Sequence, residues 1–319
     1  MTKEMIKNPL GKTGLLVSEF CLGILPMGPL YADLSREECA KIIHTALDWG
    51  INFFDTAEMY QTQTYLGRAL RDRRQKAVIS TKSSAKTYRD METSVEKSLH
   101  ELETDYIDIY HLHAARPNYD VFKVREGALR CLMDKKEAGV IKAVGIATHD
   151  VEVVESAAEV EDIDIIFPLV NIKGLGVVKG SAEDMVRAIH KAALMGKGVY
   201  TMKALGGGNL LANPGEAIDW ARKIPGVSSL AIGVISVEEL LQDLSIFGLK
   251  TGMENAEITI KEKRLFVFEK MCKGCGECVE ACHNEALFLQ DGTARVDHEK
   301  CLLCGYCSPT CSMFAIRVV

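Results

Sequence analysis

The chain has 319 residues, of which 47% are hydrophobic and 26% charged, so it can build one large globular domain and a small one. Its net charge of −6 gives no basic surface for nucleic acid, and no apolar run approaches the ~18 residues of a membrane-spanning helix. The N-terminal residues MTKEMIKNPLGKTG lack the apolar core of a signal peptide. We therefore expect a cytoplasmic protein whose partners are small molecules or proteins.

The first 250 residues alternate short apolar runs with longer amphipathic segments. The apolar runs predict eight strands, at EFCLGI, INFFDTA, KAVISTK, YIDIYHLH, IKAVGIA, DIIFPLV, GVYTMKA and SSLAIGV. Segments of helical period, such as SREECAKIIHTALDWG and SAEDMVRAIHKAALMG, predict helices between them. Eight strand and helix units indicate a (β/α)8 TIM barrel. A doubly wound sheet is the alternative, weakened because no GxGxxG motif follows the first strand.

Polar side chains stand where several of these strands end. In a (β/α)8 barrel the strand ends meet at one face, and the active site lies there. Asp55 ends the second strand, Tyr60 follows it, Lys82 ends the third, and His111 and His113 end the fourth. Asp55 would keep Lys82 charged, and this cation would lower the pKa of Tyr60 from its usual ~10 by about 3 units, roughly 4 kcal/mol, so that Tyr60 could donate a proton near neutrality. A structural ion pair beside a core histidine is the alternative.

Cysteines are concentrated near the C-terminus. Three of the eleven, Cys21, Cys39 and Cys131, are scattered and are interpreted as small buried apolar residues. The other eight form the runs CKGCGECVEACH and CLLCGYCSPTC, each with the spacing C-x2-C-x2-C-x3-C of bacterial ferredoxins that hold two clusters. The fourth cysteine of each run is expected to ligate the other cluster. The spacing predicts one [4Fe-4S] cluster on Cys272, Cys275, Cys278 and Cys311, and another on Cys301, Cys304, Cys307 and Cys282.

Zinc and disulfides are the competing interpretations of these cysteines. A third cysteine at the same interval has no role in a tetrahedral zinc site, and disulfides are disfavoured in a cytoplasmic chain. One departure from the ferredoxin pattern is that His283 and Ser312 follow the fourth cysteines, where proline is usual. The cluster ligands remain complete.

Short strands surround the cysteines. LFVFE, ALFLQDGTARVD and AIRVV predict a small α+β unit whose central hairpin turns at Asp291 and Gly292. A unit of this size has little core, so clusters would supply much of its stability. We expect a barrel over residues 1–250, a linker over 251–263 and a ferredoxin-like two-cluster domain over 264–319.

Residues 6–246 resemble the aldo-keto reductases. The motifs that carry the resemblance are LGKTGLLVSEFCLG, GINFFDTAEMY, STK, TDYIDIYHLH and MKALGGGNL. The resemblance implies hydride transfer between a nicotinamide and a carbonyl or alcohol. In it Tyr60 donates the proton, Lys82 lowers the pKa of Tyr60, Asp55 positions Lys82 and His113 orients the carbonyl oxygen. His111 is expected to face away from this group.

The resemblance also implies a nicotinamide site, with residues that fall on Asn171, Lys203, Gly206, Gly207 and Gly208. Two positions depart from the family. Gln63 stands where a glutamate is usual, and Phe167 replaces a glutamine that meets the nicotinamide. The stretch IGVISVEELLQD lacks the serine, arginine and asparagine that hold an adenosine 2′-phosphate, which favours NAD(H) over NADP(H).

Joining the two parts raises a problem of electron counting. A hydride carries two electrons and a cluster moves one, so direct exchange needs an adaptor such as a flavin. Three hypotheses follow. In the first, the chain is an aldo-keto reductase whose ferredoxin domain exchanges electrons with a redox partner such as a flavoprotein. In the second, it is an electron-transfer subunit whose barrel is a docking platform. In the third, the barrel uses another organic cofactor such as a flavin.

Overall fold

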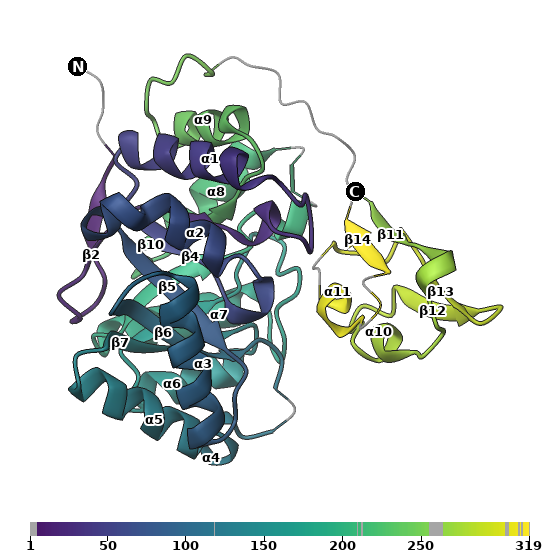
Figure 1. The fold of residues 1–319 in the computed structure, drawn as a ribbon, viewed down its shortest axis with the longest axis horizontal. Helices are drawn as coiled ribbons and strands as arrows, with labels where there is room; N and C mark the ends of the chain where they lie inside the picture. Colours follow the sequence, from purple (N-terminus) through teal and green to yellow (C-terminus); the bar gives the residue numbers. More distant parts are fainter. Residues whose placement is uncertain are drawn as a thin grey trace.

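We describe the protein from a computed structural model, which covers residues 5–117, 119–208, 210–211, 213–254, 264–303, 306–311, 313 and 315–318. Cys304, Gly305, Ser312 and most of the expected linker lie outside the described residues. No described helix is both long enough and apolar enough to cross a membrane. Figure 1 shows a large barrel beside a small C-terminal unit, residues 264–318, which we call the C-terminal unit.

Within the described residues, eight parallel strands close into a barrel in the order β10-β3-β4-β5-β6-β7-β8-β9. Closure comes from β10 pairing with β3, where Leu230 lies opposite Phe20. This confirms the (β/α)8 barrel and excludes the open doubly wound sheet. The strands are β3 Phe20–Gly23, β4 Phe53–Asp55, β5 Val78–Ser83, β6 Ile107–Ala114, β7 Ile141–Thr148, β8 Ile165–Pro168, β9 Gly198–Met202 and β10 Ser229–Gly233.

Helices cover the outside of the barrel. Most bury one face and begin at a side-chain cap: in α7 the buried Met185, Ile189 and Ala192 share a face, and Ser181 forms a capping box with Asp184. The helices are α1 Arg36–Asp48, α2 Gln63–Leu70, α3 Tyr88–Glu101, α4 Val121–Val124, α5 Glu126–Glu137, α6 Val151–Glu159, α7 Ala182–Leu194, α8 Pro214–Arg222 and α9 Val237–Ile246. Short 3-10 helices are η1 Leu25–Met27, η2 Glu58–Tyr60, η3 Arg71–Lys76 and η4 Gly206–Gly208.

The N-terminal hairpin closes one end of the barrel. Its strands, β1 Lys7–Pro9 and β2 Leu16–Ser18, pair antiparallel, and Leu10 and Val17 are fully buried in the core inside the barrel. The Lys12 amide donates to the Gly196 carbonyl at 3.2 Å, just before β9 begins. Because β9 begins at this end, the hairpin covers the N-terminal ends of the strands and leaves the C-terminal ends as the barrel mouth.

The core has one layer inside the barrel and a larger one between strands and helices. Alternation along β4 illustrates the division, because Phe53 packs inside the barrel and Phe54 packs under the helices. Cys21, Cys39 and Cys131 are fully buried, as expected for small apolar residues.

The C-terminal unit contains two short antiparallel sheets among its described residues. In one, β11 Leu265–Val267 pairs with β14 Ile316–Val318, and in the other, β12 Leu287–Gln290 pairs with β13 Thr293–Val296. Both turn residues of the second hairpin, Asp291 and Gly292, have positive φ, which the right-handed strand twist favours. One-turn helices, η5 Glu269–Met271, α10 Glu277–Glu280 and α11 Cys307–Thr310, complete the unit. The domain boundaries stay a prediction.

Candidate active site and cysteine cavities

The predicted polar residues meet at the barrel mouth. Asp55 is the last residue of β4, and the neighbouring β5 carries Lys82. The Lys82 ammonium donates to Asp55 Oδ1 at 2.6 Å and to the Thr56 carbonyl at 2.7 Å, and its side chain is 1% exposed. Burial raises the pKa of Asp55 and lowers that of Lys82, and the ion pair between them opposes both shifts.

Tyr60 and His113 lie beside this ion pair. Tyr60 ends η2 in the loop after β4, and His113 is near the end of β6. Their rings meet edge to face with centroids 5.9 Å apart, and Lys82 Nζ lies 5.0 Å from the Tyr60 ring centroid. The structure therefore brings together all four residues that the sequence placed in one group.

The direction of the Tyr60 pKa shift differs from the expectation. Burial raises the pKa of Tyr60 well above its usual value, and the Asp55 carboxylate shifts the pKa in the same direction. The predicted lowering by Lys82 is wrong for this structure. Lys82 lies over the face of the Tyr60 ring and directs its described hydrogen bonds to Asp55 and Thr56. Tyr60 therefore keeps its proton at neutral pH.

His113 is neutral. Burial, with the charges of Lys82 and Arg125, lowers the pKa of His113 to about 3. At neutral pH its imidazole can therefore donate one hydrogen bond without carrying a charge. Arg125, the residue before α5, donates to the His113 carbonyl at 3.0 Å and so fixes the end of β6.

A second hydrogen-bonded group lies below the ion pair, inside the barrel. Asp55 Oδ2 accepts from Ser80 Oγ at 3.0 Å and from the Tyr200 hydroxyl at 3.2 Å. Tyr200 Oη also lies 2.8 Å from His111 Nε2. Tyr200, on β9, and Ser80, on β5, were missed by the sequence reasoning. Alternation along each strand is the signal that could have placed them inside.

His111 points into the barrel, so the expectation that it faces away is wrong. Residues two apart along a strand lie on the same face, and His111 therefore shares the inner face with His113. Its ring packs near Phe167, with centroids 5.8 Å apart, as well as bonding Tyr200.

The two departures from the family have structural roles. The Phe167 ring stacks on Tyr200 with centroids 3.9 Å apart and an interplanar angle of 14°. Gln63 is fully buried, donates to Glu101 Oε2 at 2.7 Å and accepts from Thr81 Oγ1 at 2.6 Å. Gln63 thus joins α2 to α3 and β5.

Asn171 shapes its own loop. Its amide nitrogen donates to the Leu175 carbonyl at 2.9 Å, and its oxygen accepts from the Leu175 amide at 2.9 Å and the Lys173 amide at 3.3 Å. The amide is thereby occupied within residues 171–175. Contact between Asn171 and a nicotinamide stays a prediction.

Lys203 and the glycine run lie at the mouth and face the C-terminal unit. Gly206, Gly207 and Gly208 all have positive φ. A Cβ atom on Gly207 would lie 2.9 Å from the Leu303 carbonyl oxygen. Lys203 Nζ lies 4.5 Å from the centroid of the Tyr306 ring. Binding of a nicotinamide cofactor by these residues also stays a prediction.

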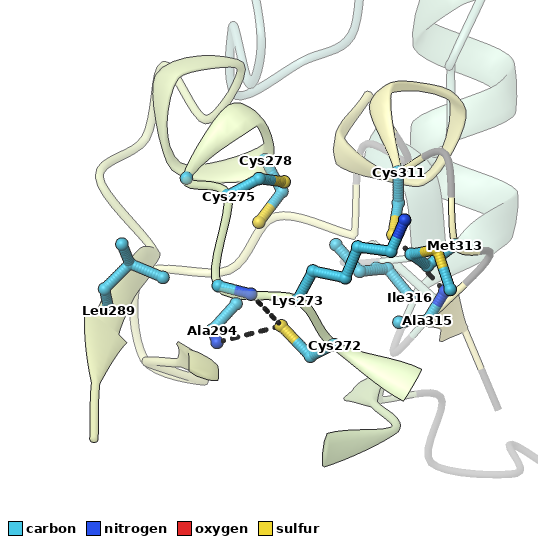
Figure 2. Close-up of a pocket in the computed structure, with 12 residues that line it drawn as sticks. Cys272, Lys273, Cys275, Cys278, Leu289, Ala294, Cys311, Met313, Ala315 and Ile316 are labelled. Atoms are coloured by element: carbon cyan, nitrogen blue, oxygen red, sulfur yellow. Dashed lines mark hydrogen bonds between the residues drawn. The ribbon is translucent and has the colours of Figure 1, made fainter. Parts of the chain in front are cut away.

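One cavity in the described part of the C-terminal unit is lined by the first cysteine set, which is Cys272, Cys275, Cys278 and Cys311. Figure 2 shows Cys278 and Cys311 on opposite sides of this cavity, with Cys272 below them in the view. The cavity has about 360 Å³ of empty space, open in part to solvent. Amides of Gly274 and Ala294 point at the Cys272 sulfur at 3.4 and 3.3 Å.

A second cavity, with about 320 Å³ of empty space that is open in part to solvent, is lined by Cys282, Cys301 and Cys307 together with Leu302 and Leu303. These cysteines and Cys304, which lies outside the described residues, are the second cysteine set. Each cavity thus combines cysteines from both runs, in the predicted pairing. In the described part of the chain no group of three or more His, Cys, Asp or Glu side chains converges closely enough to hold a single metal ion.

Cysteines that hold a cluster line a cavity, whereas ligands of a single metal ion converge on one point. A [4Fe-4S] cluster is a body of eight atoms, so its four thiolates surround a space. Burial and the neighbouring thiols raise the pKa of Cys278 to about 11, and ligation would require this proton to leave. The residues present therefore fit such a cluster at the first cavity, and those described fit one at the second.

The fold and the mouth residues define a TIM-barrel protein with a buried lysine and aspartate pair beside a tyrosine and a histidine. Residues 19–261 match the profile of the aldo/keto reductase family, and the chain belongs to that family of oxidoreductases. The match ends before the C-terminal unit.

Individual relatives agree with this assignment. Pyridoxal 4-dehydrogenase of Microbacterium luteolum is 28% identical over 51% of this chain and 61% of its own length. The uncharacterized oxidoreductase YrpG of Bacillus subtilis is 30% identical over 54% of this chain and 64% of its own. The chain thus matches about half to two thirds of the length of its curated relatives. A solved structure of a Pseudomonas aeruginosa protein assigned to the aldo-keto reductases is 28% identical, with a TM-score of 0.66, over 75% of this chain and 93% of that one.

Proposed function

We propose that the protein transfers hydride between a nicotinamide and a carbonyl or alcohol at the barrel mouth, and that its C-terminal unit holds two [4Fe-4S] clusters that relay electrons to or from a redox partner. The observation that carries the first half is the grouping of Asp55, Lys82, Tyr60 and His113 at one mouth. Four such groups converging in one place are uncommon in a structural network.

The chemistry assigned to each side chain follows from its charge and position. Protonated Tyr60 donates the proton to the substrate oxygen, and neutral His113 orients that oxygen by a hydrogen bond. Lys82, held by Asp55 and the Thr56 carbonyl, places a positive charge over the Tyr60 ring, 5.0 Å from its centroid, which would stabilise the ring after it loses its proton. The nicotinamide, when bound, supplies or accepts the hydride.

A hydroxyl deletion tests the proton donor. Anaerobically purified protein is assayed with NADH and NADPH on small aldehydes. Pyridoxal is included because one relative is a pyridoxal 4-dehydrogenase. Tyr60→Phe should lose activity by about 10²-fold or more. Tyr88→Phe removes a hydroxyl that bonds Asp134 on the outer helices, and it should keep full activity. Full activity in Tyr60→Phe would refute the donor role.

The cofactor preference rests on α9. The Glu239 carboxylate accepts from the Ile235 amide at 2.8 Å, beside the helix start where the family holds a 2′-phosphate. A carboxylate there repels a phosphate. We therefore propose NAD(H) as the preferred nicotinamide, and a lower KM for NADPH than for NADH would contradict this.

Two cavities that combine cysteines across the runs support the clusters. The cysteines would hold the iron, and the clusters supply one-electron transfer. Iron and acid-labile sulfide are measured on anaerobically purified protein, with about eight irons per chain expected. Cys275→Ser should remove about half of the iron. Zinc in place of iron, or no metal in a folded protein, would refute the proposal.

A second candidate function has specific support. Asn171 is occupied by its own loop, Phe167 replaces the family glutamine and Gly207 lies under the C-terminal unit. These observations favour a barrel that has lost nicotinamide chemistry and serves as a docking platform, or one that takes another organic cofactor such as a flavin. Calorimetric titration with NADH separates the candidates, because measurable affinity opposes the docking platform. A bound chromophore beyond the broad iron-sulfur absorption would favour the flavin.

A further inference from the structure

We propose that the C-terminal unit docks on the barrel mouth through Tyr306, and that this docking places the second cysteine set, and not the first, against the barrel. The docking rests on contacts of the chain itself. Its meaning for electron transfer rests on the proposed function, because that requires clusters in both cavities.

Tyr306 connects the unit to loops at the barrel mouth. Its hydroxyl contacts the ring nitrogens of the buried His149, which follows β7, Nε2 more closely than Nδ1, and the two rings meet at 69° with centroids 4.7 Å apart. Two cations flank the Tyr306 ring. Arg116, after β6, lies 4.9 Å from the ring centroid and Lys203, after β9, lies 4.5 Å from it.

A second contact lies next to the first. The Leu302 and Leu303 carbonyl oxygens approach Gly207 so closely that a Cβ atom there would lie 3.1 and 2.9 Å from them. Leu302 and Leu303 also line the second cavity. The same short segment therefore both contacts the barrel and encloses the second cysteine set.

The first cavity lies on the outer side of the unit. Its lining includes Leu289 and Ala294 of the β12 and β13 hairpin. In Figure 1, α11 lies on the side of the unit that faces the barrel, and this hairpin lies on the far side. Cys275, of the first set, is exposed. The first cavity therefore lies between this hairpin and Cys311, which follows α11, whereas the second cavity is lined by Leu302 and Leu303, whose carbonyls contact Gly207.

Docking has an electrostatic consequence for the inner set. Tyr306 directly precedes Cys307, so the cations of Arg116 and Lys203 lie close to the second set. Positive charge favours the reduced, more negative state of a cluster and raises its reduction potential. Separation of the unit from the barrel should therefore lower one of the two potentials and leave the other unchanged.

Gly207→Ala tests the docking from the barrel side, with Gly208→Ala as the matched control. Gly207 has φ +69° and Gly208 has φ +103°, further from the conformations open to alanine, so Gly208→Ala carries at least as much backbone strain, but a Cβ on Gly208 meets only Leu211 at 3.9 Å. Tyr306→Ala tests it from the other side. Because Tyr306 adjoins a cysteine, iron is measured first on every protein. Absence of iron from the wild-type protein refutes the clusters, whereas loss of docking is judged by amide exchange and by the two midpoint potentials.

The measurements use anaerobic full-length protein. In Gly207→Ala and Tyr306→Ala, amide exchange over residues 200–211 and 298–303 should become about tenfold faster or more. Redox titration followed by EPR should show one midpoint potential lower than in wild type and one unchanged. Gly208→Ala should keep wild-type exchange over residues 298–303 and both wild-type potentials. Wild-type exchange in both test variants, or two potentials that move together, would overturn the proposal.

Discussion

The buried pair of Asp55 and Lys82 predicts a large and non-additive effect on stability. In Asp55→Ala the Lys82 ammonium, 1% exposed, keeps only the Thr56 carbonyl of its two described acceptors. An uncompensated buried charge of this kind costs about 3–5 kcal/mol of the free energy of unfolding. Lys82→Met should cost less, because Asp55 keeps the Ser80 and Tyr200 donors. The double variant should cost less than the sum of the two.

Urea unfolding followed by tryptophan fluorescence measures this effect in the barrel alone. The chain has two tryptophans, Trp49 and Trp220, and both lie in the barrel domain. Arg73→Met is the control, because the Arg73 and Asp48 ion pair, 3.0 Å long, is exposed and should contribute less than about 1 kcal/mol. Equal small losses in Asp55→Ala and Arg73→Met, or strict additivity in the double variant, would refute the reasoning.

Three further predictions concern pH, iron and a buried amide. Because the pKa of His113 is about 3 in the folded chain and ~6.5 in the unfolded one, stability should fall as pH drops from about 6.5 toward 3. The fall should be shallower in His113→Gln, and equal slopes would contradict this. Chelation of iron should speed amide exchange throughout residues 264–318 and leave the tryptophan transition unchanged, whereas loss of that transition would refute an independent barrel. Gln63→Glu should lower the free energy of unfolding in urea by about 1–3 kcal/mol, because it sets a carboxylate against Glu101. An unchanged midpoint would show that the hydrogen bond from the Gln63 side chain to Glu101 does not stabilise the fold.

The sequence predicted the parts of the site that repeat a local pattern. Asp55, Lys82 and His113 could be found because strand ends meet at one face of a barrel, whatever the details of packing. The pairing of Cys311 with the first run followed from spacing alone, and Cys311 does line that cavity. Both results depend on geometry that short segments determine.

The remaining features depend on contacts between distant segments. Tyr306 and His149 are 157 residues apart, and no periodicity links a cysteine loop to the end of β7. The pKa of Tyr60 depends on how deeply its ring is buried and on the nearby Asp55 carboxylate, which strand assignment does not determine. The misplacement of His111 was avoidable, because the two-residue period of a strand places it with His113.

The hairpin of β1 and β2 closes one end of the barrel, so the barrel can be entered only from the opposite end. With Leu10 and Val17 sealing the base, a substrate reaches the four mouth residues from the same side that Tyr306 approaches. On the proposed function, substrate and nicotinamide would enter through the same opening at which the C-terminal unit docks. The space left beside the docked unit would then limit the size of the substrate.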